Sequence, residues 1–201
     1  MPDIALFLAA SALLTVAPGP DIVYVLTRGI AQGPRAGFAA ALGFATGCIF
    51  HTLLAALGIA ALIRSSDLAF NAVRYAGAAY LAWIGIQALR HRAAFSVEGA
   101  GDARSLALIY RQSVVGNMLN PKVTLFFLAL FTQVIHPATP LVVRVAYGAE
   151  MSFMTFAWFG FVAAALSHPI VKRRFVRVQK RVERIFGVLL IALGLKVALS
   201  R

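Results

Sequence analysis

Long apolar runs recur along this chain, and they constrain its fold more than any other feature. A helix needs about 20 apolar residues to cross the hydrocarbon core of a bilayer. Six runs approach or exceed that length: Ile4–Thr27, Gly37–Ile63, Leu68–Leu89, Gln112–Ile135, Leu141–Ser167 and Ile185–Leu199. Only 13% of the residues are charged, whereas about a quarter are charged in a soluble domain. The sequence therefore predicts an all-α, polytopic integral membrane protein with six transmembrane helices.

The net charge of +12 is distributed unevenly. Of the 19 Lys and Arg residues, thirteen fall in three connections between the predicted spans, at 28–35, 90–111 and 171–184. Connections rich in Lys and Arg normally lie in the cytoplasm, so we expect these three there and both termini outside. This location assigns the charge to topology and to contact with anionic lipid, and it argues against a nucleic-acid partner.

Several functional classes find no support in the sequence. Cys48 is the only cysteine and lies within a predicted span, which excludes disulfides and thiolate metal sites. The four histidines have no metal-ligand spacing. The sequence has no Walker motif, Ser/His/Asp set or pair of carboxylates. We therefore expect neither an enzyme nor an ATP-driven pump, and no metal or cofactor.

The chain consists of two halves that each begin with an interrupted span. The first span is interrupted at "APGPD", where Asp21 follows Pro20, and the fourth at "NMLNPKV", where Lys122 follows Pro121. Because three spans per half is an odd number, the two halves cross the membrane in opposite directions. Inverted repeats with interrupted helices at corresponding positions indicate a transporter whose substrate binds near the bilayer midplane.

The predicted division of the chain follows from these halves. A single transporter domain, 1–201, comprises a first three-helix repeat at 1–92, a cytoplasmic loop at 93–110 and a second three-helix repeat at 111–201. The third spans of the halves are also similar, "GAAYLAWIGIQAL" against "GVLLIALGLKVAL". In the second span, "GFAAALGFATG" has small residues every four positions, which predicts close packing against another helix.

Each interruption places a charge where a half-helix begins. A proline lacks an N–H and collides with the carbonyl four residues back, so the interruptions must line protein or water rather than lipid. The positive end of the helix dipole favours Asp21 and disfavours Lys122. A charge near the bilayer centre costs at least about 2.5–3.5 kcal/mol, so Lys122 needs an anion nearby. We expect a zwitterion to replace the internal pair, with its ammonium on Asp21 and its carboxylate on Lys122. The alternative is a structural Asp–Lys link between helices.

Four further polar residues lie within the predicted spans. Asn117 and Asn120 precede the second interruption, where they either cap the freed backbone or bind substrate. His51 titrates near neutrality in its ordinary state, so it either relays protons or bonds to a neighbouring helix. Glu150 either pairs with Arg144 near the headgroups or faces the substrate pathway.

These residues together resemble the lysine exporter (LysE/RhtB-type) family of bacterial amino-acid translocators, over nearly the whole chain. The resemblance is carried by "APGPDIVYVLTRGIAQGPRAGFAAALGFATG" (Ala17–Gly47), "YAGAAYLAWIGIQALR" (Tyr75–Arg90) and "GNMLNPKVTLFFLALF" (Gly116–Phe131). It implies efflux of amino acids or related small metabolites across a bacterial inner membrane, driven by a proton or ion gradient. The chain departs from many members at Ala17, where they have Thr before the first proline of the motif.

We therefore expect a secondary active exporter, coupled to the proton gradient, with substrate bound between the interrupted helices. The predicted substrate-binding residues are Pro18, Gly19, Pro20, Asp21, Asn117, Asn120, Pro121 and Lys122. The candidates for proton coupling are Asp21, His51 and Glu150. The expected partners are a small-molecule substrate and the lipid bilayer, with a homodimer left open. Two alternatives remain: a metal-cation exporter of the same fold, and a non-transporting accessory or scaffold protein.

Overall fold

The computed structural model describes residues 4–16, 19–90, 103–134, 139–165 and 169–199. Within these ranges the chain forms eight α-helices and no strand. The helices are α1 (Ile4–Val16), α2 (Pro20–Gln32), α3 (Pro34–Ser65), α4 (Asp67–Arg90), α5 (Leu106–Met118), α6 (Pro121–Val134), α7 (Leu141–Ala165) and α8 (Pro169–Leu199). The prediction of an all-α fold is confirmed for the described part of the chain.

Two pairs of helices are bent at the predicted interruptions. The axes of α1 and α2 meet at 51°, and those of α5 and α6 meet at 54°. In both pairs the second helix begins with the proline of the motif, at Pro20 and at Pro121. Proline suits the first position of a helix because the N–H that it lacks would have no intrahelical partner there. The two sharp bends therefore follow directly from the sequence.

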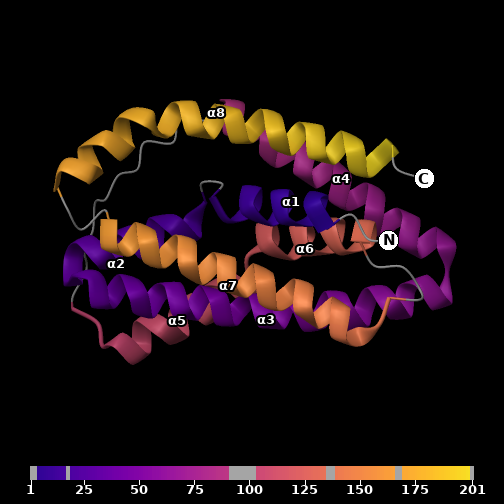
Figure 1. Ribbon diagram of the computed structural model, residues 1–201, viewed down its shortest axis with the longest axis horizontal. Coiled ribbons are helices and arrows are strands. Elements are labelled where there is room, and N and C mark those ends of the chain that lie inside the picture. Colours follow the sequence, from indigo (N-terminus) through magenta and orange to yellow (C-terminus); the bar gives the residue numbers. More distant parts are fainter. Residues whose placement is uncertain (1–3, 17–18, 91–102, 135–138, 166–168, 200–201) are drawn as a thin grey trace.

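The helices lie along a common long axis, with each half running opposite to the other (Figure 1). The end of α2 and the starts of α3, α5 and α8 lie at one end of the molecule (Figure 1). The start of α1 and the end of α8 lie at the opposite end (Figure 1). The described residues 28–35 and 103–111 and the first turns of α8 thus lie at helix ends on one side.

Two helices begin earlier than the predicted apolar spans. The last helix begins at Pro169 rather than at Ile185, because Lys, Arg, Glu and Gln are good helix formers and residues 170–186 contain no glycine or proline. The predicted loop at 93–110 overlaps α5, which begins at Leu106 after an N-cap at Ser105. The Ser105 hydroxyl accepts a hydrogen bond from the Leu108 N–H at 3.2 Å, and this cap fixes where the helix starts.

Three of the six predicted spans meet a test of length and apolar composition in the described residues. The segment Pro34–Gly58 of α3 meets it alone, and each bent pair meets it when counted as one span. Helices α4, α7 and α8 contain charged residues, such as Arg74, Glu150 and Lys196, which lower their mean hydropathy. Crossing of the membrane by these three helices stays a prediction.

Close packing of α3 against α5 confirms the role predicted for the small residues of the second span. A Cβ atom on Gly43 would lie 2.5 Å from the Tyr110 carbonyl oxygen of α5, and one on Gly47 would lie 2.6 Å from the Asn117 side chain. Only glycine at these two positions lets the backbones approach so closely. The same contact fixes Asn117, which belongs to the site described next.

Candidate functional site

The first interruption places Asp21 in the first turn of α2. Gly19, the residue before the helix, is extended, with φ −171° and ψ 178°. No side chain caps this helix terminus. Pro18 of the predicted motif lies outside the described residues. Asp21 therefore lies at the positive end of a half-helix, as the sequence predicts.

The second interruption frees the backbone carbonyl of Asn117. This carbonyl lies four residues before Pro121, which has no N–H to donate to it. It accepts a hydrogen bond from the Asn120 N–H at 2.9 Å and lies 2.9 Å from His51 Nε2. Because a carbonyl oxygen can only accept, His51 Nε2 is the donor. His51 thus binds the freed backbone, and its Nδ1 is buried with no hydrogen-bond partner among the described residues.

Asn120 contacts both the backbone at the start of α6 and the Asp21 side chain. Its side-chain oxygen accepts from the Lys122 N–H at 3.0 Å, which caps α6. Its side-chain nitrogen donates to Asp21 Oδ1 at 2.9 Å. Asn117 Nδ2 donates to Asp21 Oδ2 at 3.3 Å. Each oxygen of the Asp21 carboxylate is therefore bound by an asparagine from the other half of the chain.

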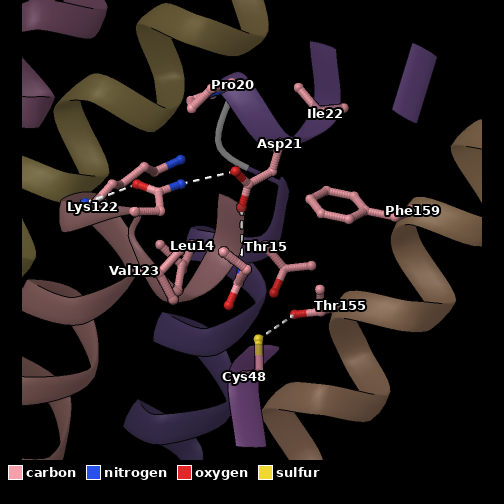
Figure 2. A pocket seen from close by; sticks show the side chains of 13 residues that line it. Leu14, Thr15, Pro20, Asp21, Ile22, Cys48, Lys122, Val123, Thr155 and Phe159 are labelled. Carbon is pink, nitrogen blue, oxygen red and sulfur yellow. Dashed lines mark hydrogen bonds between the residues drawn. The ribbon is translucent and has the colours of Figure 1, made fainter. Parts of the chain in front are cut away.

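The two intramembrane charges lie at the same site. Lys122 and Asp21 attract each other electrostatically, and Figure 2 shows both side chains at one end of a pocket. A Cβ atom on Gly19 would lie 3.1 Å from Lys122 Nζ, so the Lys122 ammonium lies against the start of α2. The sequence predicts that these charges come together from equivalent half-helices, and the geometry agrees.

The pocket below these charges is a small cavity of about 30 Å³. Asp21 and Lys122 lie at its upper end in Figure 2, and Cys48 and Thr155 lie at its lower end. The other lining residues are Leu14, Thr15, Gly19, Pro20, Ile22, Asn117, Asn120, Val123 and Phe159. One water needs about 10–15 Å³ measured in this way, so the cavity has room for about two waters and not for a free amino acid.

A second, larger cavity borders the same carboxylate. It has a volume of about 340 Å³ and lies between α2, α3 and α5. Pro20, Asp21 and Asn120 line both cavities. The larger cavity, which we call the vestibule, falls within the size range of small-molecule sites. Asp21 and Asn120 therefore lie between the two cavities.

Polar contacts join α2 to the start of α5 beside the vestibule. The Tyr24 hydroxyl, which lines it, donates to Gln112 Oε1 at 2.8 Å, and the Arg104 guanidinium donates to the same oxygen. Gln32 Nε2 donates to the Arg104 carbonyl at 2.8 Å, and its side-chain oxygen accepts from the Arg104 N–H at 3.1 Å. These contacts bridge the two helices at the end where the basic connections lie.

Glu150 lies apart from the residues that line the two cavities. Its Oε1 accepts a hydrogen bond from the Ser11 hydroxyl of α1 at 3.1 Å. The alternative pairing with Arg144 is wrong, because that guanidinium instead donates to the backbone carbonyls of Thr139 and Ala56 at 2.9 Å and 3.2 Å. Glu150 Oε2 is buried with no hydrogen-bond partner among the described residues.

The sequence did not reveal the residues at the far end of the small cavity. Cys48 comes from α3, Thr155 and Phe159 come from α7, and Thr15 comes from α1. Cys48 Sγ and Thr155 Oγ1 lie 3.6 Å apart. Each is a small polar or aromatic residue within an apolar helix, and no spacing in the sequence links residues from three separate helices.

The chain is similar to a family of known translocators. A family model described as LysE type translocator matches residues 12–201. An uncharacterized membrane protein of Vibrio cholerae is 30% identical over 203 residues, which cover 97% of this chain and 96% of that protein. No solved structure matches the chain significantly.

Two further relatives have names that state an activity. The homoserine/homoserine lactone efflux protein of Salmonella typhimurium is 35% identical over 134 residues, which cover 67% of this chain and 65% of that protein. The leucine efflux protein of Klebsiella pneumoniae is 31% identical over 183 residues, which cover 89% of this chain and 84% of that protein.

Proposed function

The chain belongs to the LysE type translocator family, and from this membership we propose that it exports an amino acid or a related small metabolite across a bacterial inner membrane. The names of the homoserine and leucine efflux relatives support this substrate class. The observation that carries the proposal is that Asp21 and Lys122, from two equivalent half-helices, line one cavity.

The geometry supports binding of a zwitterion. A substrate that enters from the vestibule reaches Asp21 and Asn120 first, because both line it. Its ammonium then binds the Asp21 carboxylate, and its carboxylate binds Lys122. The ion pair between Asp21 and Lys122 is thus exchanged for two ion pairs with the substrate, and the net charge of the site stays at zero. The protein therefore avoids a lone charge in the membrane, which costs at least about 2.5–3.5 kcal/mol.

Pairing of helices between the two halves supports the predicted inverted repeat, and with it alternating access. Helix α3 packs along its counterpart α7, and α4 packs along its counterpart α8. A Cβ atom on Gly85 of α4 would lie 2.6 Å from the Gly187 carbonyl oxygen of α8, and one on Gly187 would lie 2.7 Å from the Gly85 carbonyl oxygen. Such reciprocal contacts are expected of two units related by a pseudo-twofold axis. Transporters with this architecture move one repeat against the other around a central site.

We assign proton coupling to Asp21, because this carboxylate borders both cavities. A proton on Asp21 removes the charge that holds the substrate ammonium, so protonation favours substrate release. Inward movement of one proton is worth about 2.3 kcal/mol per 100 mV of membrane potential. His51 and Glu150 are the other candidates, and both lie outside the two linings.

Counterflow of radiolabelled amino acids in proteoliposomes tests this function. We expect the protein to exchange at least one zwitterionic amino acid, and we expect Asp21→Asn and Lys122→Met to lower exchange at least tenfold. Asp21→Asn should also abolish acceleration by an imposed proton gradient, and undiminished coupling would remove Asp21 from that role.

Controls separate the alternatives. Thermal unfolding in detergent checks that each variant folds, and Thr132→Val, a buried change outside both cavities, should exchange like the parent. Flux of a divalent cation without amino-acid exchange would indicate a metal exporter. No flux of either kind from folded protein would indicate an accessory or scaffold role.

A further inference from the structure

The charges that line the two cavities restrict the substrate. Among the described residues that line either cavity, the charged side chains are one carboxylate, Asp21, and one ammonium, Lys122. On the proposed function, the α-ammonium and α-carboxylate of the substrate engage both of them. A second charge on the substrate would then face only hydroxyl, amide, thiol and apolar groups. An unpaired charge in such a site is strongly disfavoured.

The far end of the small cavity has the chemistry of a side-chain subsite. We call this end the floor, formed by Thr15, Cys48, Thr155 and Phe159. In Figure 2 Thr15, Thr155 and Cys48 lie across the pocket from Asp21, and the Phe159 ring lies at one side, level with the Asp21 carboxylate. The Thr15 hydroxyl donates to the Ser11 carbonyl at 2.8 Å, which leaves its oxygen free to accept a further hydrogen bond.

The Thr155 hydroxyl offers a second polar contact at the floor. It lies 3.6 Å from the Cys48 thiol, and both groups can donate or accept. A thiol is a weak partner, so a substrate hydroxyl competes well for Thr155. A hydroxyl on the substrate side chain therefore finds partners on two helices, α1 and α7.

The volume of the cavity limits the side chain that the floor can accept. About 30 Å³ corresponds to about two waters, so a substrate bound to Lys122 can extend only a small side chain to the floor. A branched chain of four carbons would have to displace the packed residues Ile22 and Phe159, which are 3% and 6% exposed. Forcing extra methylenes into a packed site is unfavourable.

We propose that the floor formed by Thr15, Cys48, Thr155 and Phe159 selects small, uncharged α-amino acids and favours a side-chain hydroxyl over a methyl group of the same size. This proposal rests on the proposed function and specifies its substrate class. It assigns Thr155 as a residue that determines specificity.

Competition in the counterflow assay tests the proposal with unlabelled amino acids. We expect lysine and glutamate to compete at least about a hundredfold more weakly than alanine, because each adds an unpaired charge. Leucine should compete about tenfold more weakly than alanine because of its size. Threonine should compete about fivefold more strongly than valine, which has the same shape without the hydroxyl.

The Thr155→Val variant tests the assigned residue. It keeps the shape of the side chain and removes its hydroxyl, so the preference for threonine over valine should disappear. The control Thr132→Val removes a buried threonine hydroxyl outside both cavities and should keep the preference. An unchanged preference in Thr155→Val overturns the role of Thr155.

The outcomes distinguish failure of the two proposals. Absence of exchange for every amino acid contradicts the proposed function itself. Exchange in which lysine, glutamate or leucine competes as well as alanine leaves the exporter function intact and overturns the proposed selectivity.

Discussion

Asp21 accepts hydrogen bonds from Asn117 and Asn120, and Lys122 lies against Gly19. Asn120 and Gly19 are the residues that precede α6 and α2. Asp21 of α2 therefore lies beside the residue that precedes α6, and Lys122 of α6 lies beside the residue that precedes α2. This arrangement links the two halves of the chain through their charges, so a change at one interruption acts directly on the other.

Substitution of Asn120 separates its two roles. Asn120→Ser keeps a residue that caps helices well, but its short side chain cannot reach Asp21. We expect the midpoint of thermal unfolding to change little, and the apparent affinity for substrate to fall about tenfold or more, since hydrogen bonds to charged groups contribute about 1.5–3 kcal/mol. Equilibrium binding and unfolding measured on the same preparation check this, and unchanged affinity contradicts a role for Asn120 in the site.

The hydrogen bond to the Asn117 carbonyl favours a positioning role for His51. His51→Gln keeps an N–H donor near the Asn117 carbonyl and should retain transport within about threefold. His51→Leu removes the donor, which should lower stability by about 0.5–1.5 kcal/mol and reduce transport. Loss of proton-driven transport in His51→Gln, with substrate binding unchanged, would instead show that the imidazole itself carries protons.

The sequence predicts the charged part of the site and not its floor. Asp21 and Lys122 are conspicuous because a charge after a helix-breaking proline is costly in a membrane, and the same logic finds Asn117 and Asn120. The contact of His51 with the carbonyl freed by Pro121 needs the relative placement of α3 and α5. Cys48 and Thr155 have no such local signal, since their juxtaposition depends on how α3 packs against α7.

At the scale of helices, the contact between α3 and α5 positions the site. A Cβ atom on Gly47 would lie 2.6 Å from the Asn117 side chain, so Gly47→Ala must move Asn117 away from Asp21. We expect a loss of about 1–3 kcal/mol of stability from this overpacking, with weaker substrate binding. Unfolding in detergent and equilibrium binding measure the two effects.

A second glycine of α3 provides the matched control. No described atom lies within 4 Å of the Cβ position of Gly58. Gly58→Ala should therefore leave binding unchanged and stabilise the helix by up to about 1 kcal/mol. Equal losses in both variants would show that the effect comes from the helix itself and not from the contact with Asn117.

Helix boundaries follow from local signals to different degrees. Prolines at 20 and 121 set the starts of α2 and α6, and these starts are visible in the sequence. The start of α8 at Pro169 follows the same rule for proline, but the predicted span begins later because hydropathy marks only where a helix is apolar. A basic segment of good helix formers continues an apolar helix without any break in its backbone.

For the whole molecule, the surroundings of two equivalent positions, one in each half of the chain, differ. Ser11 and Gln112 are 101 residues apart, as are Pro20 and Pro121, so they occupy equivalent positions in the two repeats. Gln112 lines the vestibule, whereas Ser11 hydrogen-bonds to Glu150 at 3.1 Å. We infer that the vestibule opens toward the end with the basic connections and that the Ser11–Glu150 contact closes the other end. On the predicted orientation, the proposed exporter in this state takes substrate from the cytoplasm.

Labelling of single cysteines tests the orientation on which this inference depends. Leu106, at the start of α5, is 49% exposed, and Val142, at the start of α7, is 78% exposed; Figure 1 places these helix starts at opposite ends. We expect a membrane-impermeant maleimide to label Val142→Cys in intact cells and Leu106→Cys only in inside-out vesicles. The parent chain is the control, since its one cysteine, Cys48, is 3% exposed and should stay unlabelled in both. The reverse labelling pattern would mean that the vestibule opens to the outside of the cell. Labelling of both positions from the same side would mean an even number of spans between them, which contradicts the predicted inverted repeat.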